Sequence, residues 1–299
     1  MPLRSLSEVR NDWFKLLGDT DPGWRASRFG AYLDVIDELV ALERRRLTDP
    51  DAFREFRASL EKQELLFEAT SQLLSLQLAR KAWSRLSQDV LARKVRTVLS
   101  GEPLPRKDGA ADEPRDTLVE LLAAALFANC GFDAGVTAND EDLHLALAGR
   151  NDAIVVECKR PTGEETLPTA LGKLRRQLWK RGKNKQCMAV IAVERVHGFS
   201  GALLKADADA DVDFAVSLCM RRTIETIRKI CLEPRYRLSA STVGIVTFTA
   251  AVWVRKPTSH LYPSSTHLPF DIGDGTAVPD WLVRQLNRRE DRLLDEFRV

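Results

Sequence analysis

An apolar run that ends in two charged residues is the feature that most constrains this chain. Residues 154–161 read Ile-Val-Val-Glu-Cys-Lys-Arg-Pro. The run predicts a strand inside a sheet, and because side chains alternate across a strand, Glu157 and Lys159 are expected on one face. A carboxylate and an ammonium are costly there unless they are paired or bound to a metal. The run therefore favours a catalytic site at the C-terminal end of this strand. A metal-dependent phosphodiester hydrolase needs residues of this kind at such a position.

The spacing of apolar residues changes along the chain, and the expected fold changes with it. Residues 1–100 repeat apolar positions at intervals of three and four, which predicts an all-α N-terminal domain. Residues 101–113 are rich in Gly, Pro, Lys and Asp and are interpreted as a linker. Residues 114–299 mix helical and strand patterns. The expected class is α/β, a mixed central sheet flanked by helices after the helical domain.

The α/β part is expected to run helix, three strands, helix, strand, helix, strand and a closing helix. The expected strands cover residues 132–137, 142–148, 152–159, 186–196 and 243–255. The expected helices cover residues 116–129, 166–181, 211–232 and 279–297. Asp116 suits the N-cap of the first helix, and Gly131 suits its left-handed stop. Residues 256–277 show no regular pattern and are expected to be irregular.

A turn at residues 149–151 predicts a hairpin between the second and third strands. A two-residue turn places Asp142 opposite Glu157, whereas a four-residue loop places Asp142 opposite Lys159 and His144 opposite Glu157. In both registers Asp142, Glu157 and Lys159 share a face, and opposed Cβ atoms lie about 5 Å apart. Carboxylates this close repel each other unless a cation lies between them, and oxygen ligands suit Mg²⁺ or Mn²⁺. The simpler alternative is a structural ion pair on a solvated strand end.

Other residues near this hairpin have two interpretations each. Glu120, among apolar neighbours on the first α/β helix, is either at a solvated edge or a third acidic ligand. His144 is interpreted as a surface or supporting histidine, because a metal and Lys159 can perform the hydrolysis without a histidine base. Trp179 either packs into the core or stacks on a base.

The segment 159–185 is strongly basic. It carries nine Lys or Arg and two Glu, a difference of +7, in a chain whose formal net charge is +2. A charge run is usually a solvated helix face, but beside a metal site a track for the phosphate backbone explains it better. The residues expected to bind nucleic acid are Arg160, Lys173, Arg176, Lys180 and Arg181.

Composition indicates the cellular compartment in which the protein is expected. No stretch of about 18 apolar residues predicts a membrane span, and the first residues lack the apolar core of a signal peptide. The five cysteines are scattered without a CxxC pair, which gives no zinc or iron–sulfur spacing and fits a reducing compartment. A cytoplasmic location is therefore expected.

The order of the charged residues resembles the PD-(D/E)xK nuclease superfamily, whose fold is that of restriction endonucleases. The residues that carry the resemblance are Glu120 on a helix, Asp142 on a strand and Glu157-Cys158-Lys159 on its hairpin partner, within residues 114–255. Two positions depart from the family pattern. Glu141 stands where the name has a proline, and Gln177 is followed by Leu178 where the exonuclease branch has a tyrosine.

The resemblance implies roles for particular residues. The resemblance implies that the catalytic residues are Glu120, Asp142, Glu157, Lys159 and Gln177. It also implies that the ligands of Mg²⁺ or Mn²⁺ are Asp142, Glu157, the backbone carbonyl of Cys158, and Glu120. Gln177 would orient groups or contact DNA.

The expected function is a Mg²⁺-dependent nuclease acting on DNA, in the manner of bacterial restriction, repair or phage-defence endonucleases. RNA as the substrate stays open. The alternative is a catalytically inactive nucleic-acid-binding or assembly protein that keeps the nuclease fold, and a third reading is an interaction scaffold. The helical residues 1–100 are expected to recognise substrate, bind a partner protein or form a homodimer.

Overall fold

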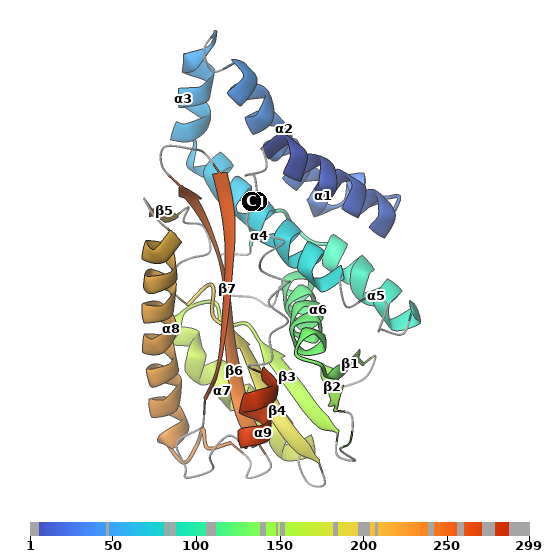
Figure 1. Cartoon of the computed structure of the whole chain (residues 1–299), viewed down its shortest axis with the longest axis vertical. Coiled ribbons are helices and arrows are strands. Elements are labelled where there is room, and N and C mark those ends of the chain that lie inside the picture. The colour runs from blue at the N-terminus through green and yellow to red at the C-terminus, as the bar shows by residue number, and fades with distance from the viewer. Residues whose placement is uncertain are drawn as a thin grey trace.

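The structure, a computed structural model, describes most of the 299 residues (Figure 1). The described residues are 6–45, 48–80, 83, 88–105, 112–137, 142–147, 149, 153–181, 185–196, 204–206, 209–238, 242–255, 260–270 and 279–286. The helices of the N-terminal part gather at one end of the molecule, and the sheet extends from the other end up to them (Figure 1).

All regular elements described before residue 100 are helical, as the sequence predicts. They are α1 (Leu6–Thr20), the 3-10 helix η1 (Trp24–Ala26), α2 (Arg28–Arg45), α3 (Pro50–Ala58), α4 (Leu60–Arg80) and α5 (Gln88–Leu99). Local sequence explains where α3 begins. The Asp49 side chain accepts a 3.2 Å hydrogen bond from the backbone N–H of Ala52, and Pro50 follows it at the first helical position.

The rest of the chain alternates helices and strands. Its helices are α6 (Glu113–Asn129), the 3-10 helix η3 (Glu164–Thr166), α7 (Leu167–Arg181), α8 (Asp209–Leu232) and α9 (Asp280–Leu286). Its strands are β1 (Asp133–Val136), β2 (Leu143–Ala146), β3 (Ile154–Lys159), β4 (Gln186–Ala192), β5 (Leu204–Ala206), β6 (Thr242–Arg255) and β7 (His260–Phe270). The mixed α/β class is therefore confirmed.

The seven described strands form one mixed sheet. β1, β2 and β3 are antiparallel neighbours, whereas β3, β4 and β6 are parallel. β5 pairs parallel with β6, and β7 pairs antiparallel with it. In the hairpin Leu143 lies opposite Val156 and His144 opposite Val155, so the register continues to Asp142 opposite Glu157. This is the register that a two-residue turn predicts.

Helices cover both faces of the sheet, and each face has its own apolar core. On one face Ile154 and Val156 of β3 pack in a buried cluster that includes α4, α5 and α6. On the other face Val155 packs with Leu171 and Leu174 of α7 and with residues of α8. Side chains therefore alternate along β3 between the α6 side and the α7 side. Residues of α1 to α5 belong to the same buried cluster as α6, and the domain boundary at 101–113 stays a prediction.

The predicted start of the first α/β helix is wrong. α6 begins at Glu113, with Asp112 at the N-cap position and Pro114 just inside the helix. Asp116 therefore lies in the first turn of the helix and does not cap it. The predicted stop is confirmed, since Gly131 has φ of +83°, in the left-handed region that glycine tolerates best.

The prediction of an irregular segment at 256–277 is also wrong in part, because residues 260–270 form β7. Pro263 and Pro269 interrupt its strand pattern in the sequence. Among the described strands β7 pairs with β6 alone, so it is an edge strand, where proline is tolerated. Residues 287–297 of the predicted closing helix lie outside the described residues.

In the described part of the chain, no helix combines the length and apolar character that crossing a bilayer requires. All five cysteines are free thiols.

Candidate active site at the end of β3

Three of the predicted site residues, Asp142, Glu157 and Lys159, meet where β2 begins and β3 ends. The carboxylate of Asp142, just before β2, accepts a 2.6 Å hydrogen bond from the backbone N–H of Cys158. The Lys159 ammonium lies 3.8 Å from Asp142 Oδ2 and 3.6 Å from Glu157 Oε2. The same ammonium donates a 2.7 Å hydrogen bond to the Cys158 carbonyl oxygen. Oxygen atoms of three residues therefore surround one cationic group.

Glu157 is completely buried on the α7 side of the sheet. An ion pair joins its Oε1 to Arg181, from the last turn of α7. Neither oxygen of Glu157 accepts a hydrogen bond within the described part of the chain, so Arg181 and Lys159 are the groups that balance its charge. Arg181, predicted to contact nucleic acid, thus lies against a predicted metal ligand.

Glu120 approaches the site from α6, on the other face of the sheet. It pairs with Lys94 of α5, and only 15% of its side chain is exposed. Burial, reinforced by the negative charge of Asp142, raises the pKa of Glu120 to about 7 despite the opposing effect of Lys94. Glu120 is therefore near the acids of the hairpin and is protonated far more readily than an ordinary glutamate.

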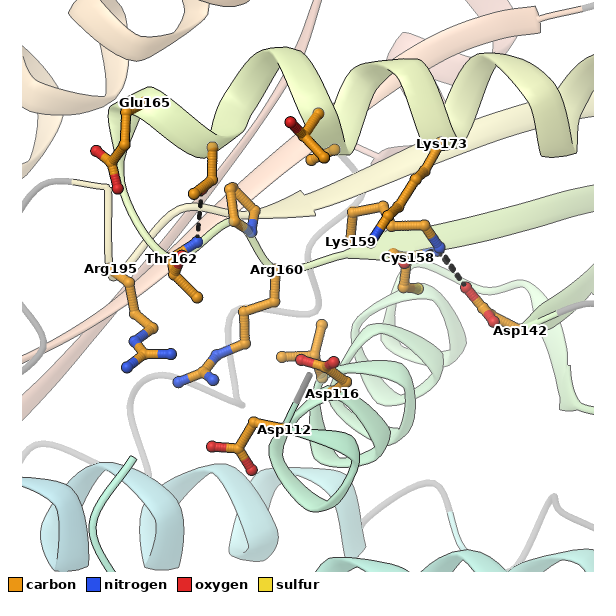
Figure 2. A pocket seen from close by; sticks show the side chains of 15 residues that line it. Asp112, Asp116, Asp142, Cys158, Lys159, Arg160, Thr162, Glu165, Lys173 and Arg195 are labelled. Atoms are coloured by element: carbon orange, nitrogen blue, oxygen red, sulfur yellow. Dashed lines mark hydrogen bonds and ion pairs between the residues drawn. The ribbon is translucent and has the colours of Figure 1, made fainter. Parts of the chain in front are cut away.

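A cavity of about 390 Å³ opens beside these residues (Figure 2). We call it the strand-end cavity, because the ends of β3 and β4 meet there with the first turns of α6 and α7. Its acidic lining residues are Asp112, Asp116, Asp142 and Glu165. Its basic lining residues are Lys159, Arg160, Lys173 and Arg195. Neither Glu120 nor Glu157 lines it.

Asp116 is a site residue that sequence reasoning assigned to a cap. It lines the strand-end cavity, and burial raises its pKa to about 6, although the charge of Arg160 opposes the shift. The available signal was the spacing of four residues between Asp116 and Glu120, which places both on one helix face.

Two arginines line the end of the cavity away from Asp142 (Figure 2). Arg160, predicted to bind nucleic acid, is nearly buried, and its Nε donates a 2.5 Å hydrogen bond to Glu194. Arg195 follows β4 and was missed by sequence reasoning. The signal for it was the parallel pairing of β3 with β4, which pairs Lys159 with Ile191 and brings the ends of both strands to the same edge.

Helix α7 carries the remaining predicted residues. Lys173 lines the strand-end cavity, whereas Arg176 and Lys180 are exposed elsewhere on the helix. The side-chain oxygen of Gln177 is buried and has no hydrogen-bond partner among the described residues. Trp179 is 58% exposed, so the core-packing interpretation is wrong, and the Arg175 guanidinium lies 5.9 Å from its ring centroid.

Mg²⁺ and Mn²⁺ bind oxygen ligands, so the oxygen atoms around Lys159 are the candidate donors. The described residues contain no group of three or more His, Cys, Asp or Glu side chains that could hold a metal ion. Two carboxylates and a carbonyl nevertheless converge on the Lys159 ammonium, and Mg²⁺ commonly uses one or two carboxylates with water and substrate phosphates. The donors therefore fit the chemistry of Mg²⁺ or Mn²⁺, with Lys159 among them. Glu141 lies outside the described residues.

Comparisons of the chain with protein-family models, with curated proteins and with solved structures give no match. The function is therefore inferred from the geometry of the site.

Proposed function

We propose that the protein is a Mg²⁺- or Mn²⁺-dependent nuclease that hydrolyses phosphodiester bonds of DNA. The observation that carries this proposal is the position of the Lys159 ammonium, among oxygen atoms of Asp142, Glu157 and Cys158 at the edge of a cavity. The order of α6, β1, β2, β3, α7 and β4 supports a restriction-endonuclease-like core. Because the same fold can have different functions, the proposed activity depends on the site residues.

In this proposal Asp142, Glu157 and the Cys158 carbonyl would hold the cation, with Glu120 as an additional acid. The bound cation would supply stabilisation of charge on the phosphate and a lowered pKa of a coordinated water. Glu157 is buried and its Oε1 pairs with Arg181, so a cation would compete with Arg181 for this carboxylate.

The chain's own residues have distinct tasks in the reaction. Lys159 can donate hydrogen bonds to the phosphate oxygens on which negative charge develops, or can orient the attacking water. The hydrogen bond from Cys158 fixes the carboxylate of Asp142 next to Lys159. Asp116 faces the same cavity, and its pKa of about 6 suits a group that accepts a proton near neutral pH.

The substrate strand would be guided by the basic residues of α7. Lys173 lies in the cavity wall, and Arg176 and Lys180 are exposed further along the helix. Contacts of this kind neutralise phosphates and are independent of base sequence. We further propose that the protein acts as an endonuclease in bacterial restriction, repair or phage defence, and that it is cytoplasmic. The helical residues 1–100 would form a homodimer or bind a partner protein.

One observation favours the alternative, a nucleic-acid-binding protein that keeps the fold without activity. Arg181 pairs with Glu157, and the Lys159 ammonium lies among the oxygens that a metal would use. Both contacts neutralise the acids without any divalent cation.

The test incubates the purified protein with supercoiled plasmid, linear duplex and RNA, each with Mg²⁺, Mn²⁺ or EDTA. The proposal expects cleavage with the divalent cations and intact substrate in EDTA, and loss of supercoiled circles would show endonuclease action. Salt-dependent binding of intact DNA under every condition would contradict the proposal and favour the binding protein.

A further inference from the structure

Two guanidinium groups lie side by side at one end of the strand-end cavity. Figure 2 shows Arg160 and Arg195 at the end of the cavity away from Asp142, whereas the Lys159 ammonium lies beside Asp142. The nuclease proposal uses the Asp142 end and gives no task to Arg195.

Arg160 is held in place by the protein. Its side chain is 4% exposed, and Nε is bonded to Glu194 at 2.5 Å. Because that bond occupies Nε and the residue still lines the cavity, the guanidinium is a fixed, oriented positive group rather than a mobile surface charge.

Arg195 has no such anchor. It is half-buried and lines the cavity, but within the described part of the chain it makes no hydrogen bond or ion pair. Burial and the neighbouring charge of Arg160 lower the pKa of Arg195, whereas the carboxylates of Glu68, Glu194 and Asp112 raise it. The two guanidinium groups repel each other where they lie. An anion between them would relieve this repulsion.

The nearby carboxylates do not fill that role. Asp112 and Glu68 accept hydrogen bonds from Arg115, at 2.9 and 2.5 Å, and Glu194 accepts one from Arg160. Asp116 has a raised pKa and Glu165 is exposed at the rim, and neither forms an ion pair with Arg195 among the described residues.

We propose that Arg195 and Arg160 form a phosphate-binding subsite of the strand-end cavity, for a phosphate of the nucleic acid other than the one beside Lys159. Guanidinium groups bind phosphate through paired N–H donors, which gives both affinity and orientation. The subsite rests on the proposed function, and its phosphate comes either from the end of a strand or from an internal position next to the scissile bond.

The test measures binding in EDTA, so that no cleavage is needed. The probes are short single-stranded oligodeoxynucleotides with a 5′-phosphate, with a 3′-phosphate or with hydroxyl ends, and inorganic phosphate as a competitor. The proteins are the wild type, Arg195→Gln, Arg195→Lys and the control Arg54→Gln, whose exposed side chain pairs with Asp51 far from the cavity.

Arg195→Gln is expected to weaken binding about tenfold and to lower the salt slope by about one. Arg195→Lys should keep most of the salt slope while it loses affinity, and Arg54→Gln should match the wild type. A loss confined to a phosphorylated end identifies a terminal phosphate, and an equal loss for all oligonucleotides identifies an internal one. Phosphate that competes in the wild type but not in Arg195→Gln supports the subsite in both cases.

Equal binding of every probe by the wild type and Arg195→Gln would overturn the subsite. Failure of the nuclease proposal looks different, because the wild type would then bind the probes through Arg195 and still leave DNA uncut with Mg²⁺ or Mn²⁺.

Discussion

The carboxylate of Asp142 accepts a 2.6 Å hydrogen bond from the backbone N–H of Cys158. Asp142 comes just before Leu143, the first residue of β2, so this contact extends the β2–β3 pairing by one residue through a side chain. It places a carboxylate beside Lys159 through the register of the hairpin, so the backbone determines much of the site's geometry.

Asp142→Ala should therefore loosen the exit of β3. The Cys158 N–H loses its acceptor, and a lost hydrogen bond to a charged group lowers the free energy of unfolding by about 1.5–3 kcal/mol. Amide exchange at Cys158 should become faster, as measured by NMR. Asp142→Asn is the matched control, since it keeps an oxygen acceptor. Equal protection of the Cys158 amide in Asp142→Ala and the wild type would contradict this role.

Glu120 should make stability depend on pH. Its pKa is about 7 in the folded protein against an ordinary 4.5, so the folded state holds a proton that the unfolded chain releases between these values. The free energy of unfolding should fall as pH rises through this window, by about 3 kcal/mol in all. Urea unfolding from about pH 5 to about pH 8 measures it.

Glu120→Gln is the informative variant for this dependence. It should flatten the decline, leaving the smaller fall of the same sign that Asp116 contributes between 3.8 and about 6. A decline of unchanged size in Glu120→Gln would show that another group titrates.

Arg181 should compete with a metal for Glu157. Arg181→Met leaves the buried carboxylate with Lys159 alone, at 3.6 Å, and should lower the free energy of unfolding by about 3 kcal/mol without metal. Mg²⁺ or Mn²⁺ should then raise the Tm of this variant more than that of the wild type, because the cation binds the folded state. Arg176→Met, exposed on the same helix, is the control. Equal metal-induced shifts in all three proteins would count against Glu157 as a ligand.

Arg115 should be among the most destabilising positions to change. It is buried and donates to Glu68 at 2.5 Å, to Asp112 at 2.9 Å and to the Tyr32 hydroxyl at 3.0 Å. Arg115→Met leaves two buried carboxylates without their cation and should cost about 3–5 kcal/mol in denaturant unfolding. The exposed Arg54→Met should change stability by about 0.5 kcal/mol or less. A similarly small loss for Arg115→Met would refute this.

Elements with strong local patterns were predictable from sequence. The apolar run of β3 and the stripe Leu171, Leu174 and Leu178 of α7 are buried as expected. β7 was not predicted, because Pro263 and Pro269 interrupt its strand pattern in the sequence, although it pairs with β6, the strand that comes just before it in the chain.

The site was predictable where the hairpin alone determines it. Asp142 and Lys159 meet through the register of adjacent strands. Arg195 and Asp116 reach the cavity only through the packing of β4 and α6, which local patterns do not contain. The same limit applies to Arg181, because spacing shows that a residue lies on a helix face but not which charged group that face meets.

The most direct test of the nuclease proposal is single-turnover cleavage of labelled duplex DNA in Mg²⁺ and in Mn²⁺. It compares the wild type with Lys159→Met, Asp142→Asn and the control Lys62→Met, whose lysine pairs with Glu38 among the N-terminal helices. The account predicts cleavage by the wild type and Lys62→Met, and a loss of at least about a hundredfold in the two site variants with DNA binding retained. Cleavage at the wild-type rate by either site variant would contradict it.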